Sequence, residues 1–192
     1  MTWRNDQVSQ PETEKIIEVA RECLARPGDF VELGCYKGDT ALLVAEILSS
    51  DRRLYIYDSF EGLPEKSAED VSVLGEDFRG GELIVTKREV KERFLRAGLK
   101  VPVIKKAWFN ELTPEDMPEK IAFAFLDGDF YESIKDSLRL VGPRMADGGV
   151  IIVHDYNNPA LPGVKKAVDE WACGKDVEKS AFQSMVIFKN KR

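Results

Sequence analysis

Short apolar runs alternate with longer amphipathic stretches along most of the chain. Apolar or β-branched runs of about four to eight residues between turn residues are typical of strands. An apolar repeat every three or four residues is typical of helices. This pattern predicts strands at residues 29–33, 53–57, 101–107, 121–126, 149–153, 176–182 and 184–189.

The amphipathic stretches predict helices at residues 11–25, 40–48, 86–97, 131–141 and 164–172. Two of them begin with the spacing of a capping box, Ser9 with Glu12 and Thr86 with Glu89. In a capping box each side chain bonds the backbone of the other residue, which satisfies free N–H groups at the helix start. These two helix starts are therefore the most sharply defined.

The order of the elements predicts the fold class. Strands that alternate with helices are typical of a doubly wound α/β sheet. The run IAFAFL at 121–126 suits a central parallel strand covered on both faces. The very short link between the last two strands makes them antiparallel. We therefore expect one domain, 1–192, with a Rossmann-like, mostly parallel, seven-stranded sheet and an antiparallel end strand.

Composition narrows the functional classes. The 192 residues carry a net charge of −6, which leaves no electrostatic footprint for nucleic acid or an anionic membrane. No apolar run approaches the roughly 20 residues of a membrane span. The three cysteines lie far apart, as expected of reduced thiols in a cytoplasmic protein. A homodimer fits this picture, with the N-terminal helix and the antiparallel sheet end as contact surfaces.

The segment DFVELGCYKGDT, residues 29–40, combines a strand, a glycine turn and a helix start. Gly34 and Gly38 allow a tight turn close to a ligand, and Tyr36 lies between them. A dinucleotide site prefers three glycines around a pyrophosphate, which Glu32 would repel. Glu32 suits an ammonium group instead. S-adenosylmethionine carries that group and no phosphate, and an ordinary βα turn is the alternative.

Other candidate cofactor residues follow the next two strands. Asp58 ends the second strand, where an acidic side chain can accept both ribose hydroxyls of an adenosine, and Ser59 adjoins it. The alternative for Asp58 is capping of a loop. Trp108 and Phe109 follow the third strand. They suit two roles: enclosing an adenine between the two rings, or filling core positions under a loop.

Acidic residues collect where the fourth and fifth strands end. Asp127 follows one strand, and His154 and Asp155 follow the other. Since these strands should be neighbours, the three side chains are expected to face one another across a cleft. Such a set suits one hard divalent cation, Mg²⁺, which would activate a substrate hydroxyl. Loop hydrogen bonding is the alternative for Asp127 and His154.

Two segments flank this core. Residues 1–28 contain the N-terminal helix. Residues 61–85 are polar and weakly periodic, and they follow a strand end where an open α/β sheet binds its ligand. We interpret 61–85 as a lid or substrate-facing insertion, with an ordinary surface loop as the alternative.

Five stretches together resemble the macrocin O-methyltransferase (TylF-type) family: VELGCYKGDT, DSFEGLP, LDGDFYES, GGVIIVHDY and PGVKKAVDEW, within residues 29–171. The resemblance implies a class I methyltransferase that methylates hydroxyls of sugars or other small natural products. It implies that Glu32, Gly34 and Gly38 approach the methionine part of S-adenosylmethionine and that Asp58 holds the ribose. It also implies Mg²⁺ at Asp127 and Asp155, with Asp127 in or beside the proton-removing role.

One position departs from the family pattern. The family commonly has Asp-Asp-Tyr where this chain has His154-Asp155-Tyr156. Imidazole is a poorer Mg²⁺ ligand than carboxylate, so the metal is weaker, different or absent. His154 is then an alternative general base, because its ordinary pKa is near neutral.

Two functional alternatives remain open at this level. One is a non-catalytic S-adenosylmethionine-binding partner or regulatory module, which the change at His154 favours. The other is an NAD-linked oxidoreductase, which the missing third glycine and the lack of a Tyr-x-x-x-Lys pair disfavour.

Overall fold

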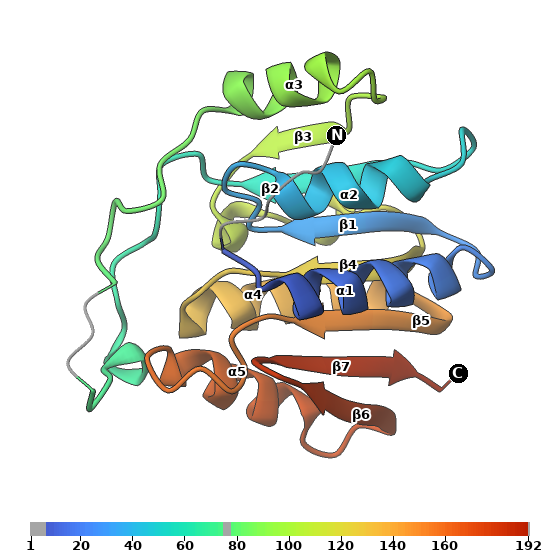
Figure 1. Cartoon of the computed structure of the whole chain (residues 1–192). Coiled ribbons are helices and arrows are strands. Elements are labelled where there is room, and N and C mark those ends of the chain that lie inside the picture. The colour runs from blue at the N-terminus through green and yellow to red at the C-terminus, as the bar shows by residue number, and fades with distance from the viewer. Residues whose placement is uncertain (1–6, 75–77, 192) are drawn as a thin grey trace.

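The computed structural model describes residues 7–74 and 78–191. Within these residues, seven strands form one sheet in the order β3-β2-β1-β4-β5-β7-β6 (Figure 1). The strands are β1 Asp29–Leu33, β2 Leu54–Asp58, β3 Val103–Lys106, β4 Ile121–Leu126, β5 Met145–Val153, β6 Val177–Phe182 and β7 Met185–Asn190. All seven predicted strands are present.

Strand directions confirm the predicted mixed sheet. β1 pairs in parallel with β2 and β4, β2 with β3, and β4 with β5. β7 runs antiparallel to both β5 and β6, so the antiparallel end of the sheet is confirmed. Every residue of β4 is buried, as its apolar sequence predicts.

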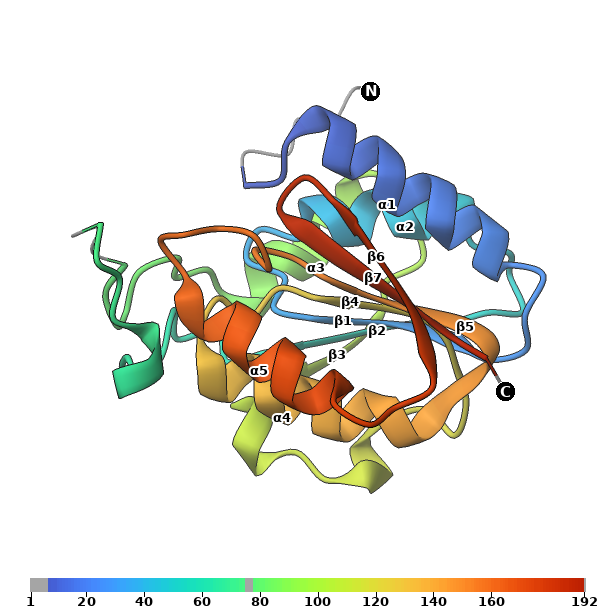
Figure 2. The same cartoon turned by 90° about the horizontal axis from the view of Figure 1, so that it is seen from below.

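Helices cover both faces of the sheet, as Figure 2 shows. α1, α2 and α3 pack on one face, where Ile16, Ala41 and Val90 share a buried cluster with β1 and β4 side chains. α4 and α5 pack on the other, where Ile134 and Val164 belong to a second cluster. The helices are α1 Gln10–Cys23, α2 Asp39–Ile47, α3 Lys87–Arg96, α4 Tyr131–Val141 and α5 Pro162–Ala172. The doubly wound prediction is therefore confirmed.

Both predicted capping boxes are present. Ser9 and Glu12 cap α1, and Thr86 and Glu89 cap α3. None of the described helices is long and apolar enough to cross a membrane.

The segment predicted as a lid runs between β2 and α3, and its residues 75–77 lie outside the described chain. Its short 3₁₀ helix η1, Ala68–Asp70, packs beside α5 (Figure 1). The carboxylate of Asp70 accepts a 2.7 Å hydrogen bond from the backbone N–H of Tyr131 at the start of α4. The first part of the segment is therefore fixed to the helical layer, and its role as a lid stays a prediction.

The chain order places a crevice between β1 and β4. β1 leads outward to β2 and β3, whereas β4 leads to β5 on the other side. Ligands of open α/β sheets bind where the strand order reverses in this way, outside the carboxyl ends of the strands. The remaining 3₁₀ turns, η2 Phe109–Glu111, η3 Pro114–Asp116 and η4 Gly142–Arg144, lie in the connections that lead into β4 and β5.

Candidate active site

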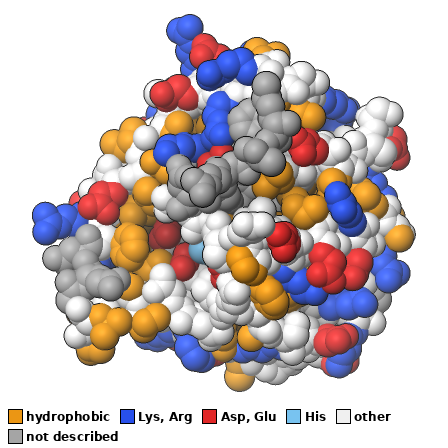
Figure 3. Space-filling model, in the orientation of Figure 1, with side chains coloured by type: hydrophobic (Ala, Val, Ile, Leu, Met, Phe, Trp, Pro, Cys, Tyr) orange, Lys and Arg blue, Asp and Glu red, His pale blue; other side chains and the backbone are white. Residues whose placement is uncertain are grey.

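A pocket lies at this crevice. The turns after β1, β2, β4 and β5 all contribute to its lining. Figure 3 shows acidic side chains and the single histidine of the chain in a hollow of this face. Of the predicted site residues, Gly38 does not line the pocket. The others do: Glu32, Gly34, Tyr36, Asp58, Ser59, Trp108, Phe109, Asp127, His154 and Asp155.

The glycine turn brings β1 and β4 into close approach. Gly34 has φ +86°, and a Cβ added there would lie 2.0 Å from the backbone oxygen of Asp127. Gly38 has φ +78° and precedes α2 as its N-cap. Gly38 therefore shapes the turn from outside the pocket. Tyr36 also has a positive φ, 43°, which a non-glycine residue adopts only when its surroundings enforce it.

Glu32 places a carboxylate on the floor of the pocket. The residue is 2% exposed, and its Oε2 has no hydrogen-bond partner within the described residues. Burial raises the pKa of Glu32 well above its ordinary value, and the charges of nearby aspartates, Asp127 first, add to this. A buried carboxylate without a partner is costly, so the site is built for a cationic or hydrogen-bond-donating ligand group.

Asp58 holds the glycine turn in place. Its Oδ2 accepts hydrogen bonds from the backbone N–H groups of Cys35, at 2.9 Å, and Tyr36, at 3.3 Å. Its Oδ1 accepts one from Phe60 N–H at 2.7 Å. The loop-capping alternative is therefore present in the structure, and Oδ1 keeps one lone pair for a ligand. Ser59 donates to the carbonyl of Gly62 at 3.1 Å, which shapes the loop beyond.

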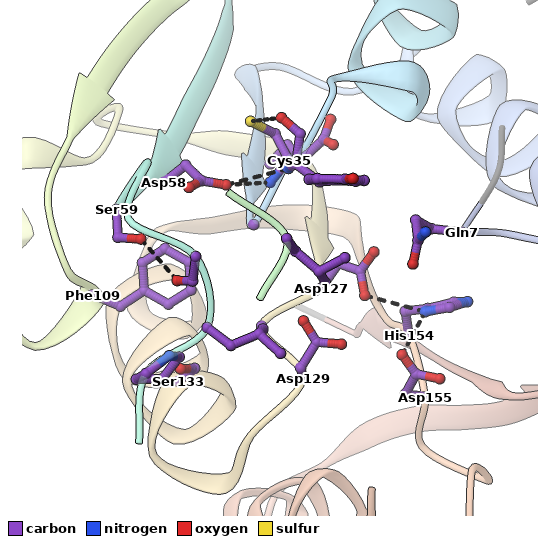
Figure 4. A pocket seen from close by; sticks show the side chains of 18 of the residues that line it. Gln7, Cys35, Asp58, Ser59, Phe109, Asp127, Asp129, Ser133, His154 and Asp155 are labelled. Carbon is purple, nitrogen blue, oxygen red and sulfur yellow. Dashed lines mark hydrogen bonds and ion pairs between the residues drawn. The ribbon is translucent and has the colours of Figure 1, made fainter. Parts of the chain in front are cut away.

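The aromatic pair after β3 contributes to both the pocket and the core. Trp108 and Phe109 line the pocket, and Phe109 also packs against the α4–α5 core. A Cβ added to Gly128 would lie 2.9 Å from the Ser133 side chain and 3.3 Å from the Phe109 ring. The Ser133 side chain and the Phe109 ring thus occupy the space that a side chain at Gly128 would need. Figure 4 shows the Phe109 ring between Ser59 and Ser133 at one end of the pocket.

His154 brings the acidic cluster together. Its Nδ1 lies 3.1 Å from Asp127 Oδ1 and 2.8 Å from Asp155 Oδ2 (Figure 4). On the other side, Nε2 lies 3.8 Å from Glu12 Oε2 of α1. Burial alone would lower the pKa of His154, but the Asp127 charge and the contacts with all three carboxylates outweigh it and raise this pKa. The predicted convergence of strand ends is thus present.

The donor chemistry of this cluster fits a divalent cation. One atom each from Asp127, His154 and Asp155 lies within 4.8 Å of the others. Two carboxylates and one imidazole are the donors that first-row transition metals accept, whereas Mg²⁺ prefers oxygen alone. The metal itself stays a prediction.

Asp129 is a site residue that sequence reasoning did not single out for a role. It lines the pocket beside Asp127 and has φ +60°. Burial raises the pKa of Asp129 well above its ordinary value, and the charges of Asp127 and Asp155 raise it further. The LDGD sequence placed it at the strand end, but gave no sign of its burial.

Other pocket residues come from segments that carry no recognisable motif. Gln7 and Val8 reach the pocket from the N-terminal segment, and Phe78 and Leu83 reach it from the segment 61–85. Their placement depends on how these segments pack over the strand ends, which local sequence does not encode. Val8, Phe78 and Leu83 add apolar side chains to the acidic lining of the pocket.

Strand order, strand directions and an acidic pocket without a phosphate-binding glycine loop together define the class: a Rossmann-like methyltransferase fold. The chain belongs to the macrocin O-methyltransferase (TylF) family, whose model matches residues 11–184. The predicted family resemblance is therefore confirmed.

Relatives and solved structures agree with this family. The chain is 33% identical over 154 residues to 8-demethyl-8-(2,3-dimethoxy-alpha-L-rhamnosyl)-tetracenomycin-C 4'-O-methyltransferase of Streptomyces olivaceus, a match covering 76% of this chain and 58% of the relative. It is 31% identical over 186 residues to demethyldecarbamoylnovobiocin O-methyltransferase of Streptomyces niveus, covering 85% of this chain and 67% of the relative. The solved structure of the O-methyltransferase NovP matches with a TM-score of 0.81 at 28% identity, covering 94% of this chain and 80% of that chain. The chain thus spans 58% and 67% of the lengths of these two curated relatives.

Proposed function

We propose that this chain is an S-adenosylmethionine-dependent O-methyltransferase that acts on a hydroxyl of a sugar or another small secondary metabolite. The observation that carries the proposal is the buried Glu32 Oε2, which has no partner among the described residues and lies beside the Gly34 turn. An ammonium group supplies the missing partner, and a pyrophosphate is repelled. Family membership and the O-methyltransferase relatives support the same assignment.

In this proposal the cofactor lies along the crevice at the switch point. Glu32 would hold its ammonium group, and the remaining lone pair of Asp58 Oδ1 would accept from a ribose hydroxyl. Trp108 and Phe109, which line the pocket, would flank the adenine. Methyl transfer would then take place beside the cluster at the ends of β4 and β5.

The acceptor hydroxyl binds beside Asp127. Its oxygen attacks the methyl carbon in line with the departing sulfur, so an O–C bond forms while the S–C bond breaks. The hydroxyl proton passes to the Asp127 carboxylate, and S-adenosylhomocysteine leaves. Rate enhancement comes mainly from positioning and from charge compensation in a partly dry site.

Asp127 is the better proton acceptor of the two predicted candidates. Nδ1 of His154 faces the two aspartates and Nε2 faces Glu12, so neither ring nitrogen is directed at open pocket space. His154 therefore holds Asp127 and Asp155 in place. A divalent cation held by Asp127, His154 and Asp155 would supply positive charge that makes an acceptor hydroxyl more acidic.

Calorimetric titration with S-adenosylhomocysteine tests the cofactor assignment. The wild-type chain is expected to bind it, and Glu32→Gln is expected to weaken binding at least tenfold. Glu22→Gln, on the exposed end of α1, is the matched control and should bind like the wild type. Failure of the wild-type chain to bind would overturn the proposal.

Turnover separates an enzyme from a binding module. A panel of sugar nucleotides and glycosylated natural products is incubated with S-adenosylmethionine, and S-adenosylhomocysteine release is measured. Methylation of at least one acceptor supports the enzyme. Tight cofactor binding without turnover across the panel, with and without divalent metal, would instead favour the non-catalytic module.

A further inference from the structure

Glu12 is held more firmly than capping of α1 requires. Its Oε2 accepts from Ser9 Oγ at 2.6 Å as part of the capping box. Its Oε1 accepts from the backbone N–H of Ser184 at 3.0 Å and from the Ser184 hydroxyl at 2.5 Å, in the turn between β6 and β7. The residue is 5% exposed. Segments from the two ends of the chain therefore fix one carboxylate in position.

This fixed carboxylate faces His154. Glu12 Oε2 lies 3.8 Å from His154 Nε2, and that nitrogen is buried with no hydrogen-bond partner within the described residues. Two carboxylate oxygens lie nearer to Nδ1, Asp155 Oδ2 at 2.8 Å and Asp127 Oδ1 at 3.1 Å, so the proton shared with them sits on Nδ1 when no cation is bound. A cation bound at Nδ1 would displace this proton, and the remaining ring N–H, on Nε2, would then face Glu12.

An imidazole oriented in this way is the usual form of a metal-binding histidine. Such histidines donate their second ring N–H to a carboxylate or carbonyl, which fixes the tautomer and makes the ligand more basic. Among divalent ions, imidazole nitrogen suits first-row transition metals, whereas Mg²⁺ prefers carboxylate, carbonyl and water oxygens. The position of His154 thus bears on which ion the cluster accepts.

We propose that Glu12 orients His154 as a nitrogen ligand beside Asp127 and Asp155, and that this set selects a first-row transition-metal ion, such as Mn²⁺, over Mg²⁺. This inference rests on the proposed function, since it concerns the same site. It assigns Glu12 a positioning role, because Glu12 acts through His154. It also makes α1 part of the active site.

Metal binding to the chelator-treated full chain, saturated with S-adenosylhomocysteine, tests this. Affinities for Mn²⁺ and Mg²⁺ are measured by calorimetry and by electron paramagnetic resonance. We expect the preference of the wild type for Mn²⁺ over Mg²⁺ to exceed that of His154→Asp at least tenfold. Electron spin echo modulation of bound Mn²⁺ should show coupling to a ¹⁴N nucleus in the wild type and lose it in His154→Asp.

Glu12→Gln tests the positioning role, because it removes the charge while its single amide oxygen can still accept the Ser9 backbone N–H of the capping box, at the cost of the Ser184 N–H bond. Mn²⁺ binding is expected to weaken about tenfold, as for other residues that orient metal ligands. Glu14→Gln, on the exposed side of the same helix, is the matched control and should leave binding unchanged. His154→Asn serves as a second variant if His154→Asp does not fold, and it should also lose the ¹⁴N coupling.

Three results would overturn the inference: equal metal preference in wild type and His154→Asp, no ¹⁴N coupling in the wild type, or no metal binding by a chain that binds S-adenosylhomocysteine. The last result would make His154 itself the cation of the cluster. If the wild-type chain did not bind S-adenosylhomocysteine but still preferred Mn²⁺ over Mg²⁺, the proposed function would be overturned and the metal assignment would stand.

Discussion

Gly34 lies directly against the backbone carbonyl of Asp127, so the glycine turn after β1 is in direct contact with the predicted catalytic aspartate. A Cβ added at Gly34 would lie 2.0 Å from that carbonyl oxygen. Gly34→Ala is therefore expected to lower the free energy of unfolding by about 2–4 kcal/mol, from crowding and from the positive φ. Cofactor binding should be lost even where the variant folds.

Gly98→Ala isolates the cost of the positive φ. Gly98 has φ +69°, but no atom lies within 4 Å of its added Cβ. Urea denaturation should show a clearly smaller loss for Gly98→Ala than for Gly34→Ala. Equal losses would mean that close approach of β1 and β4 contributes nothing beyond backbone conformation.

Asp127→Asn tests the proton-accepting role. Asparagine keeps the size of the side chain but cannot take up the hydroxyl proton. Turnover is expected to fall about 10²–10⁴-fold, the usual contribution of a general base, with little change in S-adenosylhomocysteine affinity. Asp147→Asn, on the exposed start of β5, is the control and should keep full turnover. Turnover of Asp127→Asn within threefold of the wild type would contradict the assignment.

Asp70 anchors the segment between β2 and α3. It is 1% exposed, and it accepts hydrogen bonds from Tyr131 N–H at 2.7 Å and Ser67 N–H at 2.9 Å. Asp70→Ala leaves these buried donors unsatisfied, so we expect the free energy of unfolding to fall by about 2 kcal/mol. Proteolytic cleavage between residues 60 and 75 should also become faster.

Glu69→Gln is the control for Asp70. Glu69 forms a surface ion pair with Lys166 at 3.4 Å, and such pairs contribute about 0–1 kcal/mol. Glu69→Gln is therefore expected to have the same stability and the same cleavage rate as the wild type. If Asp70→Ala were cleaved at the same rate as the wild type, other contacts would be holding the segment in place.

Local sequence was sufficient for the elements and for the strand-end residues that line the pocket. The all-apolar run of β4 and the capping boxes of α1 and α3 each depend on neighbouring residues, and each is present as predicted. The meeting of Asp127 with His154 followed from strand order, because carboxyl ends of adjacent parallel strands share one edge. Each of these patterns determines the geometry of the residues that form it.

The rest of the site depends on packing between distant segments. Glu12 and His154 are 142 residues apart, and the capping-box pattern already gave Glu12 a local role. The place of the half-buried Asp129 in the pocket depends on segments packed over the strand ends. Asp129 and Asp155 have positive φ values of 60° and 58°. A residue with a side chain does not favour such values, so the surrounding structure imposes them.

Asp169 lies outside the active site and makes the free energy of unfolding depend on pH. Tyr156 OH donates to it at 2.8 Å and Lys179 at 2.9 Å, and Lys165 binds its other oxygen. Burial would raise the pKa of Asp169, but these hydrogen bonds outweigh it and lower the pKa to about 2. In an unfolded chain the pKa of an aspartate is about 3.9.

Between these two pKa values the unfolded chain binds the proton more readily, so acid favours unfolding. The stabilisation from Asp169 is therefore fully present above about pH 4 and is lost as the pH falls toward 2. Asp169→Asn should lower the free energy of unfolding at pH 7, and the difference from the wild type should shrink below pH 4. Asp176→Asn, at an exposed ion pair with Lys191, is the control and should change stability little at any pH. A difference for Asp169→Asn that stays constant from pH 7 to pH 2 would mean that its carboxylate charge does not tie β6 to α5.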